Sequence, residues 1–202
     1  MTLMSNALSR GRIITEHRPW SRIVVDADAW SEAGSQLGDG VLTLLALWGE
    51  PEAVHMAVAD AADPASALVL SIECPDRCYP SVGRLHAPAI RLERAVQDLF
   101  GITANGLPDS RAWLDHGQWG VRAPLAQEPM PDRPAEDYAF LPVEAENIHQ
   151  VPVGPVHAGV IEPGHFRFSA DGETVVRLEQ RFGYTHKGVE SLFRGASLSR
   201  AA

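Results

Sequence analysis

The sequence lacks long apolar runs, contains only two cysteines and has no excess of basic residues. No stretch approaches the roughly 20 consecutive apolar residues that cross a bilayer, so we expect no membrane-spanning helix. The opening residues MTLMSNALSRGR lack the apolar core and the small-residue cleavage site of a signal peptide, which makes the cytoplasm the expected location. The net charge of −9 argues against nucleic acid or an anionic membrane surface as the main partner.

The two cysteines, Cys74 and Cys78, are separated by three residues that include a proline. A structural zinc site would need further ligands, and redox dithiols normally have two intervening residues. The pattern therefore indicates two free thiols, with a disulfide as the alternative. A GxGxxG phosphate loop and an iron–sulfur cysteine set are also missing from the sequence, so we expect no cofactor bound by this chain alone.

What is present is an ordinary globular composition, with 45% hydrophobic and 21% charged residues. The most informative stretch covers residues 92–113. Leu92, Val96, Leu99 and Phe100 fall on one face of a predicted helix, and Glu93, Arg94, Gln97 and Asp98 fall on the other. Gly101 stands where a left-handed C-cap is expected, and Asn105-Gly106 predicts a tight turn.

This stretch resembles the signature of the complex I C-subunit family, the accessory protein beside the quinone-reducing large subunit of NADH dehydrogenase. Membrane-bound NiFe hydrogenases and formate hydrogenlyases share the family. The residues that carry the resemblance are Glu93, Arg94, Asp98, Gly101, Pro108, Asp109 and Arg111. Ala95 and Leu107 depart from the family pattern, which usually has Glu at the first position and His or Lys at the second. These departures indicate a divergent member nearer the hydrogenase branch.

Upstream of the signature, the pattern predicts a short helix over residues 29–37 with Asp28 as its cap. Strands are expected over 20–25, 41–50, 53–60 and 66–74, and residues 1–19 are expected to be loosely docked. Residues 41–50 are almost wholly apolar, as in a central strand; a helix is the alternative there, but Val41 and Trp48 favour a strand. Short connections favour antiparallel neighbours.

These elements predict an α+β fold: a mixed or antiparallel sheet with helices on one face, followed by a Pro-rich extended arm and a C-terminal β-hairpin plus a short helix. The resemblance implies the same fold. We expect an accessory-subunit domain over 1–112, a Pro-rich arm or linker over 113–148, and the truncated start of a large-subunit domain over 149–202. Trp113 and Trp119 are expected to anchor the start of the arm. Trp119, Arg122, Pro124 and Leu125 loosely resemble the family's own tail.

In the last segment, Asp171-Gly172 between two alternating apolar runs predicts a hairpin, and a short helix is expected over 189–193. This segment resembles the N-terminus of the large subunit of membrane-bound NiFe hydrogenases and of its complex I counterpart, the D subunit. The elements that carry this second resemblance are Gly154, Pro155, His157, residues 162–167 and 171–173, Gly183, Tyr184, residues 186–188 and Glu190.

The second resemblance implies roles for two residues. His157 matches a histidine near the quinone headgroup, and Glu162 matches a glutamate proposed to relay protons at the nickel site. A partly desolvated carboxylate can exchange protons near neutral pH, and a histidine can hydrogen-bond a quinone oxygen. The nickel centre needs two pairs of cysteine thiolates that this sequence does not contain, so we expect neither residue to be catalytic in this chain alone.

The leading hypothesis is an accessory, non-catalytic subunit or fragment of a complex I-like NADH dehydrogenase or a membrane-bound NiFe hydrogenase. It would pack against the large and iron–sulfur subunits and reach the membrane only through partners. The complete complex would carry iron–sulfur clusters and nickel–iron or quinone. The hairpin, marginal by itself, is expected to pack on its own domain or to form a homo-oligomer by exchange with a second copy.

Two alternatives remain open. The chain could be a truncated catalytic hydrogenase large subunit, which a longer related sequence with nickel-ligating cysteines would reveal. It could instead be a small metal-dependent enzyme, because imidazole and carboxylate ligands suit zinc or iron. Its candidate ligands are His157, Glu162, His165 and His186. The absence of a compact helical pair such as HExxH weighs against this last hypothesis.

Overall fold

The computed structural model describes residues 11–128, 130, 131, 134, 137–144, 147–156, 159–185 and 187–201. The chain divides into two compact units. The first unit contains the described residues up to Ser110 and those of Val121–Pro131, and the second contains Arg111–Gly120 and the described residues after Pro131. The proline-rich segment 113–148 therefore contributes to both units, and the division into three parts stays a prediction.

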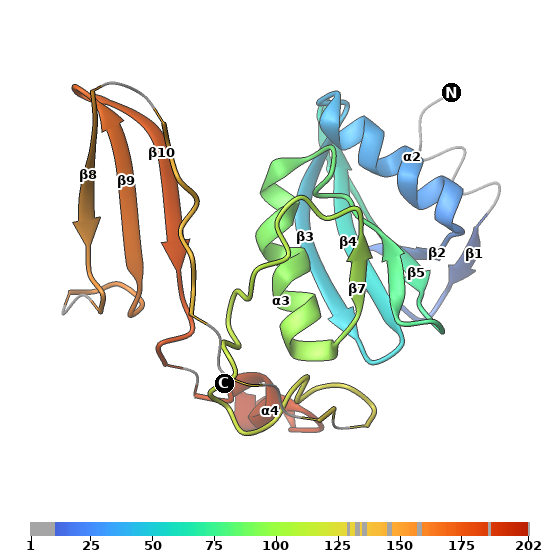
Figure 1. Cartoon of the computed structure of the whole chain (residues 1–202). Helices are drawn as coiled ribbons and strands as arrows, with labels where there is room; N and C mark the ends of the chain where they lie inside the picture. The colour runs from blue at the N-terminus through green and yellow to red at the C-terminus, as the bar shows by residue number, and fades with distance from the viewer. Residues whose placement is uncertain are drawn as a thin grey trace. The chain divides into compact units, whose positions relative to one another are not determined.

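The first unit is built on a five-stranded sheet with strand order β1-β2-β5-β4-β3 (Figure 1). Only β2 and β5 run parallel, so the sheet is mixed. The strands are β1 (Arg12–Ile14), β2 (Ser21–Val24), β3 (Leu42–Glu50), β4 (Ala53–Asp60) and β5 (Asp63–Glu73). β1 lies within the segment that was expected to be loosely docked. The antiparallel neighbours β3, β4 and β5 confirm the prediction from their short connections.

β3 is an edge strand, so the prediction that it is central was wrong. One side of β3 is buried through Leu42 and Leu47, while Leu45 and Trp48 are 49% and 36% exposed. The run of apolar residues predicted burial on both faces. Composition cannot distinguish that case from an edge strand with exposed apolar side chains.

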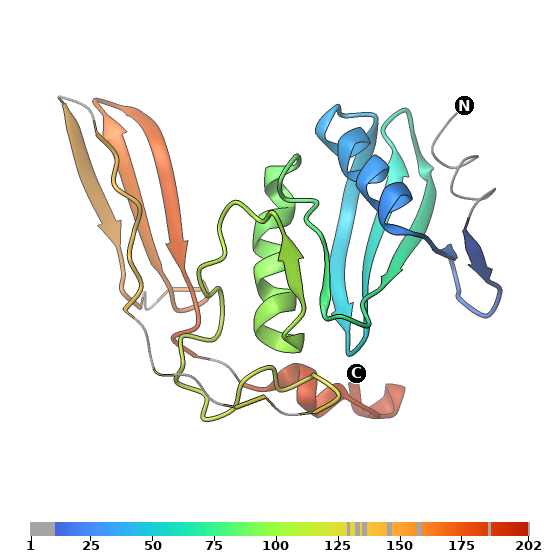
Figure 2. The same cartoon turned by 45° about the vertical axis from the view of Figure 1, so that its right-hand side comes forward.

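Helices α2 (Ala27–Gly38) and α3 (Ile90–Phe100) cover one face of the sheet (Figures 1 and 2). The strand register places Ile23, Leu70, Met56 and Leu47 in one row across β2, β5, β4 and β3. These residues belong to a single buried core, which also includes Trp30 and Leu37 of α2 and Val96 of α3. The predicted α+β fold with helices on one face is therefore confirmed.

Asp26, not Asp28, caps α2: its Oδ1 accepts a hydrogen bond from the Ala29 N–H at 2.8 Å. The helix begins two residues earlier than predicted, so Asp28 falls in its first turn. Both aspartates satisfy the sequence rule for a helix start, and only the backbone geometry distinguishes them.

A short parallel pair of strands, β6 (Cys78–Pro80) and β7 (Thr103–Asn105), lies on either side of α3 in the sequence. The one-turn 3-10 helix η1 (Ala87–Ala89) leads directly into α3. The predicted turn after β7 is present, with the Leu107 N–H bonded to the Ala104 carbonyl at 3.2 Å. Cys74 and Cys78 are both free, as expected, and burial raises the pKa of Cys74 to about 11.

The second unit contains a three-stranded antiparallel sheet of order β10-β9-β8 (Figure 2). Its strands are β8 (Ile148–Val153), β9 (His165–Asp171) and β10 (Thr174–Arg181), and the short helices α4 (Val189–Phe193) and α5 (Leu198–Ala201) follow. The predicted hairpin and the helix over 189–193 are confirmed, and Gly172 supplies the positive φ of +56° at the turn. The sequence did not indicate β8, because Pro152 interrupts it.

Candidate functional site

Glu93, the first signature residue, lies fully buried on α3. Its carboxylate accepts hydrogen bonds from the Ser81 hydroxyl at 2.7 Å, the Val82 N–H at 2.7 Å and the Gly83 N–H at 3.0 Å. Burial raises the pKa of Glu93, and these donors oppose that shift. Glu93 therefore joins residues 81–83 to α3, a structural role that the helical pattern did not reveal.

The surroundings of Glu93 are closely packed. A Cβ placed on Gly83 would lie 2.7 Å from a Glu93 carboxylate oxygen and 2.9 Å from Ile90 Cγ1. The Tyr79 ring packs edge-on against Trp30 with the ring centroids 5.9 Å apart. Burial raises the pKa of the Tyr79 phenol well above 10, and the nearby Glu93 carboxylate adds to that shift. A buried phenol of this kind stays protonated, so packing, not solvent access, shapes this region.

Arg94, the second signature residue, pairs with Asp109: its Nη1 lies 3.2 Å from Asp109 Oδ2. The Arg94 side chain is only 5% exposed and that of Asp109 is 21% exposed. The pair attaches the loop that begins at Pro108 to α3. Asp98 is also buried. The charged side of the signature helix is thus internal, although an amphipathic pattern usually indicates a solvated polar face.

Gly101 ends α3 in the left-handed conformation, with φ of +67°, as predicted. Its N–H donates to the Gln97 carbonyl at 2.9 Å. A Cβ on this glycine would come within 2.5 Å of Met130 Sδ. The position requires glycine both for its φ and because the segment around Met130 packs against the helix end.

Arg111, the last signature residue, belongs to the second unit. Its guanidinium lies 2.9 Å from Glu179 Oε1, donates to the Ala139 carbonyl at 2.7 Å and stands 4.9 Å from the centre of the Tyr138 ring. The structure therefore separates the signature into two groups. Six residues, Glu93 to Asp109, belong to the first unit, and Arg111 joins segments of the second.

The second unit also contains the residues of the second predicted site. Glu162 is exposed on the segment that precedes β9, and His157 and His186 lie outside the described residues. His165 packs against the Phe140 ring with 4.8 Å between the ring centroids, and burial lowers the pKa of His165. The proton relay by Glu162 and the quinone contact by His157 stay predictions.

Trp113 and His116 join the start of the proline-rich arm to the end of β10. The Trp113 and Phe182 rings meet edge-on at 5.1 Å, and His116 Nε2 lies 2.9 Å from the Phe182 carbonyl oxygen. Gly183 allows this approach, because a Cβ there would overlap the Leu114 carbonyl. The expected anchoring role of Trp113 agrees with this geometry.

A polar cluster that the sequence did not indicate lies on the sheet face opposite the helices. The Ser71 hydroxyl lies 2.9 Å from Arg22 Nε, which donates to it, and 2.8 Å from His55 Nδ1. His55 Nε2 faces the Glu50 carboxylate at 3.4 Å, which favours the tautomer with the proton on Nε2. His55 is 1% exposed, and burial lowers its pKa to about 4. These residues come from separate strands, so their proximity depends on the register of the sheet.

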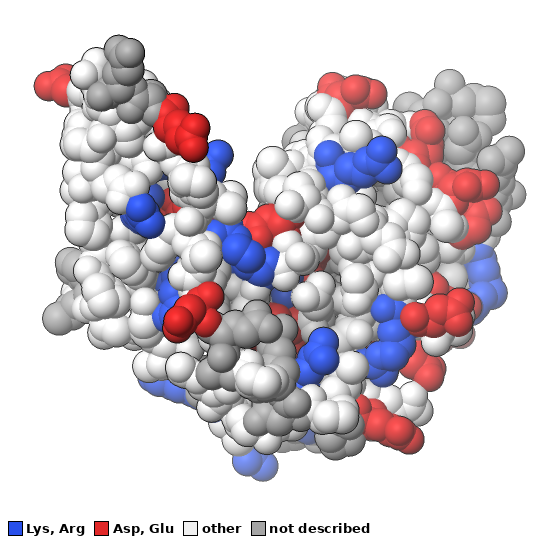
Figure 3. Space-filling view, viewed as in Figure 1, with Lys and Arg blue, Asp and Glu red and all other residues white. Residues whose placement is uncertain are grey.

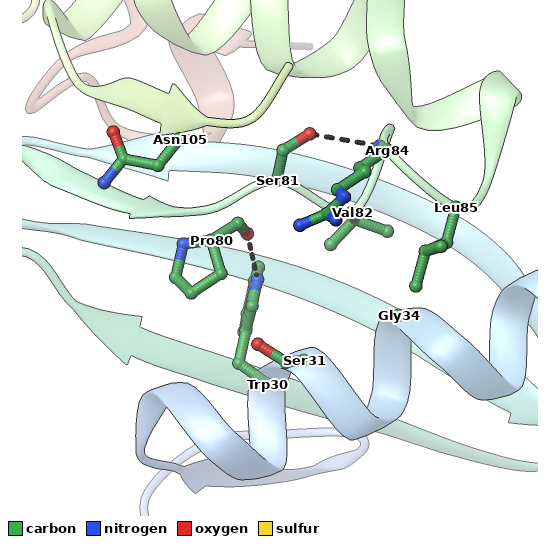
Figure 4. A pocket seen from close by; sticks show the side chains of 9 residues that line it. All are labelled: Trp30, Ser31, Gly34, Pro80, Ser81, Val82, Arg84, Leu85 and Asn105. Atoms are coloured by element: carbon green, nitrogen blue, oxygen red, sulfur yellow. Dashed lines mark hydrogen bonds between the residues drawn. The ribbon is translucent and has the colours of Figure 1, made fainter. Parts of the chain in front are cut away.

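A cavity of about 300 Å³ lies between α2 and residues 80–85 (Figure 4). The Trp30 indole N–H donates to the Pro80 carbonyl at 3.0 Å on its lining. The lining residues are Trp30, Ser31, Gly34, Pro80, Ser81, Val82, Arg84, Leu85 and Asn105. Ser81 and Val82 are also bonded to Glu93, so the signature residue supports one wall of this cavity.

Within the described residues we find no group of three or more metal-ligating side chains placed to hold an ion. No helix in that part of the chain is long and apolar enough to cross a membrane. On the face seen in Figure 3, acidic and basic side chains are interspersed, and the described residues form no broad patch of one sign.

Comparison with known proteins identifies one family. The family model described as "Respiratory-chain NADH dehydrogenase, 30 Kd subunit" matches residues 23–133, a range that includes all seven predicted signature residues. The match therefore covers the end of β2, strands β3 to β5, helices α2 and α3 and the loop that Arg94 holds.

Curated relatives of several kinds are similar over more than half of the chain. Hydrogenase-4 component G of Escherichia coli is 33% identical over 129 residues, covering 60% of this chain and 23% of the relative. Formate hydrogenlyase subunit 5 of the same organism is 37% identical over 123 residues, covering 56% and 22%. The NADH-quinone oxidoreductase C/D protein of Bacteroides fragilis is 27% identical over 135 residues, covering 56% and 26%. The chain thus spans about a quarter of the length of these relatives.

Proposed function

Because the chain belongs to the family of the 30 kDa subunit of respiratory-chain NADH dehydrogenase, we propose that it is an accessory, non-catalytic part of a complex I-like or membrane-bound NiFe hydrogenase complex. The relatives carry the names of hydrogenase, formate hydrogenlyase and NADH-quinone oxidoreductase proteins, which supports this proposal. The predicted resemblance to the accessory subunit of complex I is confirmed by the family match.

The observation that carries the proposal is the burial of the signature charges. Glu93 and Arg94 bond to neighbouring loops of their own unit, and both side chains are almost fully shielded from solvent. Two catalytic side chains would need to reach the substrate and to lie within hydrogen-bonding distance of the groups that react. The signature instead maintains the shape of a domain that can dock on other subunits.

Under this proposal, electron transfer belongs to the partner subunits, which would carry iron–sulfur clusters and either nickel–iron or quinone. This chain would pack against the large and iron–sulfur subunits, on the cytoplasmic side and attached to the membrane only through them. Exchange of the hairpin with a second copy is not needed for strand pairing, because β8 already pairs with β9 within one chain.

The test is mild affinity capture of the protein from its own source, followed by mass spectrometry of the captured proteins. We expect an iron–sulfur subunit and a nickel-bearing or quinone-reducing large subunit in comparable amounts. An Arg94→Ala variant, whose docking domain is weakened, should recover less of both. Recovery of the protein alone from gently lysed cells would contradict the proposal.

A second candidate is that the chain represents the beginning of a catalytic large subunit. It is favoured by the second unit, in which the segment that resembles the large subunit forms the hairpin and helix predicted from its local pattern, and by the much greater length of the relatives. The discriminating measurement is the mass and metal content of the protein isolated from its source. A polypeptide well above 21.9 kDa with stoichiometric nickel would establish this candidate. A polypeptide of 21.9 kDa without nickel would exclude it.

A further inference from the structure

The loop between β5 and β6 is flanked by the two cysteines, Cys74 directly after β5 and Cys78 as the first residue of β6. The Arg77 N–H donates to the Cys74 carbonyl at 3.0 Å, which closes a turn with Pro75 at its second position. Arg77 then adopts the left-handed conformation, with φ of +55°. A turn followed by a left-handed residue is a common geometry of three-residue loops that reverse the chain.

Other elements hold this loop in place. The Cys74 N–H donates to the Glu52 carbonyl at 2.8 Å, and the Thr103 N–H of β7 donates to the Arg77 carbonyl at 2.9 Å. Arg77 Nη2 also donates to the Phe100 carbonyl at 2.6 Å, at the end of α3. Both ends of the loop are therefore attached to the first unit, which limits how far the two thiols can move apart.

The two thiols interact but differ in their access to solvent. Burial raises the pKa of Cys74 to about 11, and the neighbouring Cys78 adds to that shift, so the two sulfur atoms lie near each other. Cys74 is 1% exposed, whereas Cys78 is partly exposed. A disulfide requires Cα atoms roughly 4.4–6.8 Å apart. The residues on either side of a three-residue loop are separated by about that distance.

Such a pair can exchange with a small disulfide in two steps. The Cys78 thiolate attacks one sulfur of the small disulfide, forms a mixed disulfide and releases one small thiol. The Cys74 thiolate then attacks the Cys78 sulfur, which forms the bond between the two cysteines and releases the second small thiol. In total the protein loses two electrons and two protons, and the small disulfide gains them.

We propose that Cys74 and Cys78 form a reversible thiol–disulfide site for small disulfides such as oxidised glutathione, in which the partly exposed Cys78 reacts first and the buried Cys74 completes the bond. Closure fixes the loop from which Arg77 supports the end of α3. The structure has both thiols free, which is the reduced form of the site. The proposal depends on this loop alone and is independent of the accessory function.

The experiment treats the full, reduced chain with oxidised glutathione, blocks the remaining thiols with N-ethylmaleimide and identifies the products by mass spectrometry. We expect the wild-type chain to become lighter by two hydrogen atoms, with no glutathione attached. Cys74→Ala should instead keep one glutathione on Cys78, at about ten times the wild-type level, because the second thiol is missing. Cys78→Ser should take up about tenfold less glutathione than Cys74→Ala, since Cys74 is buried.

The matched control is the same oxidation of the wild-type chain in concentrated urea, where the loop is not held. We compare the ratio of glutathione to its disulfide at which half of the chains are closed. Closure in the folded chain should be favoured about tenfold over closure in the unfolded chain, because the fold positions the thiols. This comparison needs no variant, so it decides the proposal even if Cys74→Ala does not fold.

Three results would overturn the proposal. They are glutathione retained on Cys78 of the folded wild-type chain, a disulfide that joins two chains, and closure no more favourable in the folded chain than in urea. Dispersed amide signals establish that each variant is folded. Co-purification of partner subunits plays no part in these measurements, so their failure would leave the accessory function untouched.

Discussion

The two units of the chain differ in what they bury. The first buries charge: Glu93, Arg94 and Asp98 are at most 4% exposed and lie beside a continuous apolar core. The second exposes apolar side chains along its strands, with Val151, Val175 and Leu178 between 45% and 52% exposed. Among the described residues of the second unit, Ala170 is the single buried hydrophobic residue.

The difference indicates that the units depend on their surroundings to different degrees. A buried charge without a hydrogen-bond partner costs several kcal/mol of folding free energy, at the order-of-magnitude level. Buried charges whose partners lie in the same unit therefore indicate that this unit needs no other subunit to satisfy them. Exposed valines and leucines on neighbouring strands are typical of a surface that another protein covers. The first unit should therefore hold its structure alone, whereas the second should be the less stable of the two.

The largest expected loss of stability comes from replacing one tryptophan in each unit by alanine, which tests that difference. Trp30→Ala removes a fully buried indole, and we expect a loss of about 4 kcal/mol of unfolding free energy in the first unit. Trp113→Ala removes a half-buried ring in the second unit and should cost about 2 kcal/mol. Hydrogen exchange of β4 and β9 amides measures each unit separately. Equal losses would remove the distinction between the two interiors.

The next prediction concerns buried charge in the first unit. Glu93→Ala leaves the Ser81, Val82 and Gly83 donors without their acceptor, and we expect destabilisation of about 3 kcal/mol. Glu52→Ala, an exposed carboxylate on the β3–β4 turn, should change stability by less than about 0.5 kcal/mol. Urea denaturation of both variants decides the matter, and similar midpoints would show that the Glu93 bonds contribute little.

A pH dependence should accompany the buried His55. Its pKa in the folded chain is about 4, below the usual 6.5, so the unfolded chain takes up a proton first as pH falls. The stabilisation is complete above pH 6.5, is lost as pH falls toward 4, and amounts to at most about 3 kcal/mol. His55→Gln should flatten this part of the stability curve. An unchanged slope in that variant would assign the pH dependence to other groups.

The smallest expected change in stability comes from replacing one glycine in each unit by alanine. Gly101→Ala meets both a positive φ and the Met130 sulfur, so we expect a cost of about 2 kcal/mol. Gly172→Ala has the same backbone strain in open space and should cost about 1 kcal/mol. Thermal denaturation of the two variants gives the comparison, and a larger effect at Gly172 would reverse it.

Much of the fold could be predicted because it depends on local pattern. Periodicity placed α3, glycine placed its end, and Asp171-Gly172 placed the hairpin. The position of β3 at the edge could not be predicted, since strand order depends on pairings between distant segments. β8 could not be predicted for a related reason: its pairing with β9 overrides the proline that interrupts its sequence.

The candidate site likewise has features that the sequence predicts and features that depend on tertiary packing. The signature residues were identifiable from sequence, but their burial was not, because an amphipathic pattern does not tell what covers the polar side of a helix. The His55 cluster and the Arg84 cavity gave no sequence signal at all. Each depends on side chains from separate segments, four strands in the first case and three segments in the second, that meet only in the folded chain.

The sequence by itself determined the α+β class, the helix with its glycine end, the hairpin and the family, because these follow from local periodicity, turn chemistry and a motif of fixed spacing. Only the tertiary structure decided the strand order, the burial of Glu93 and Arg94 and the cavity with Arg84 on its wall. The physical reason is that burial and proximity arise from long-range packing, which places residues together regardless of their separation along the chain.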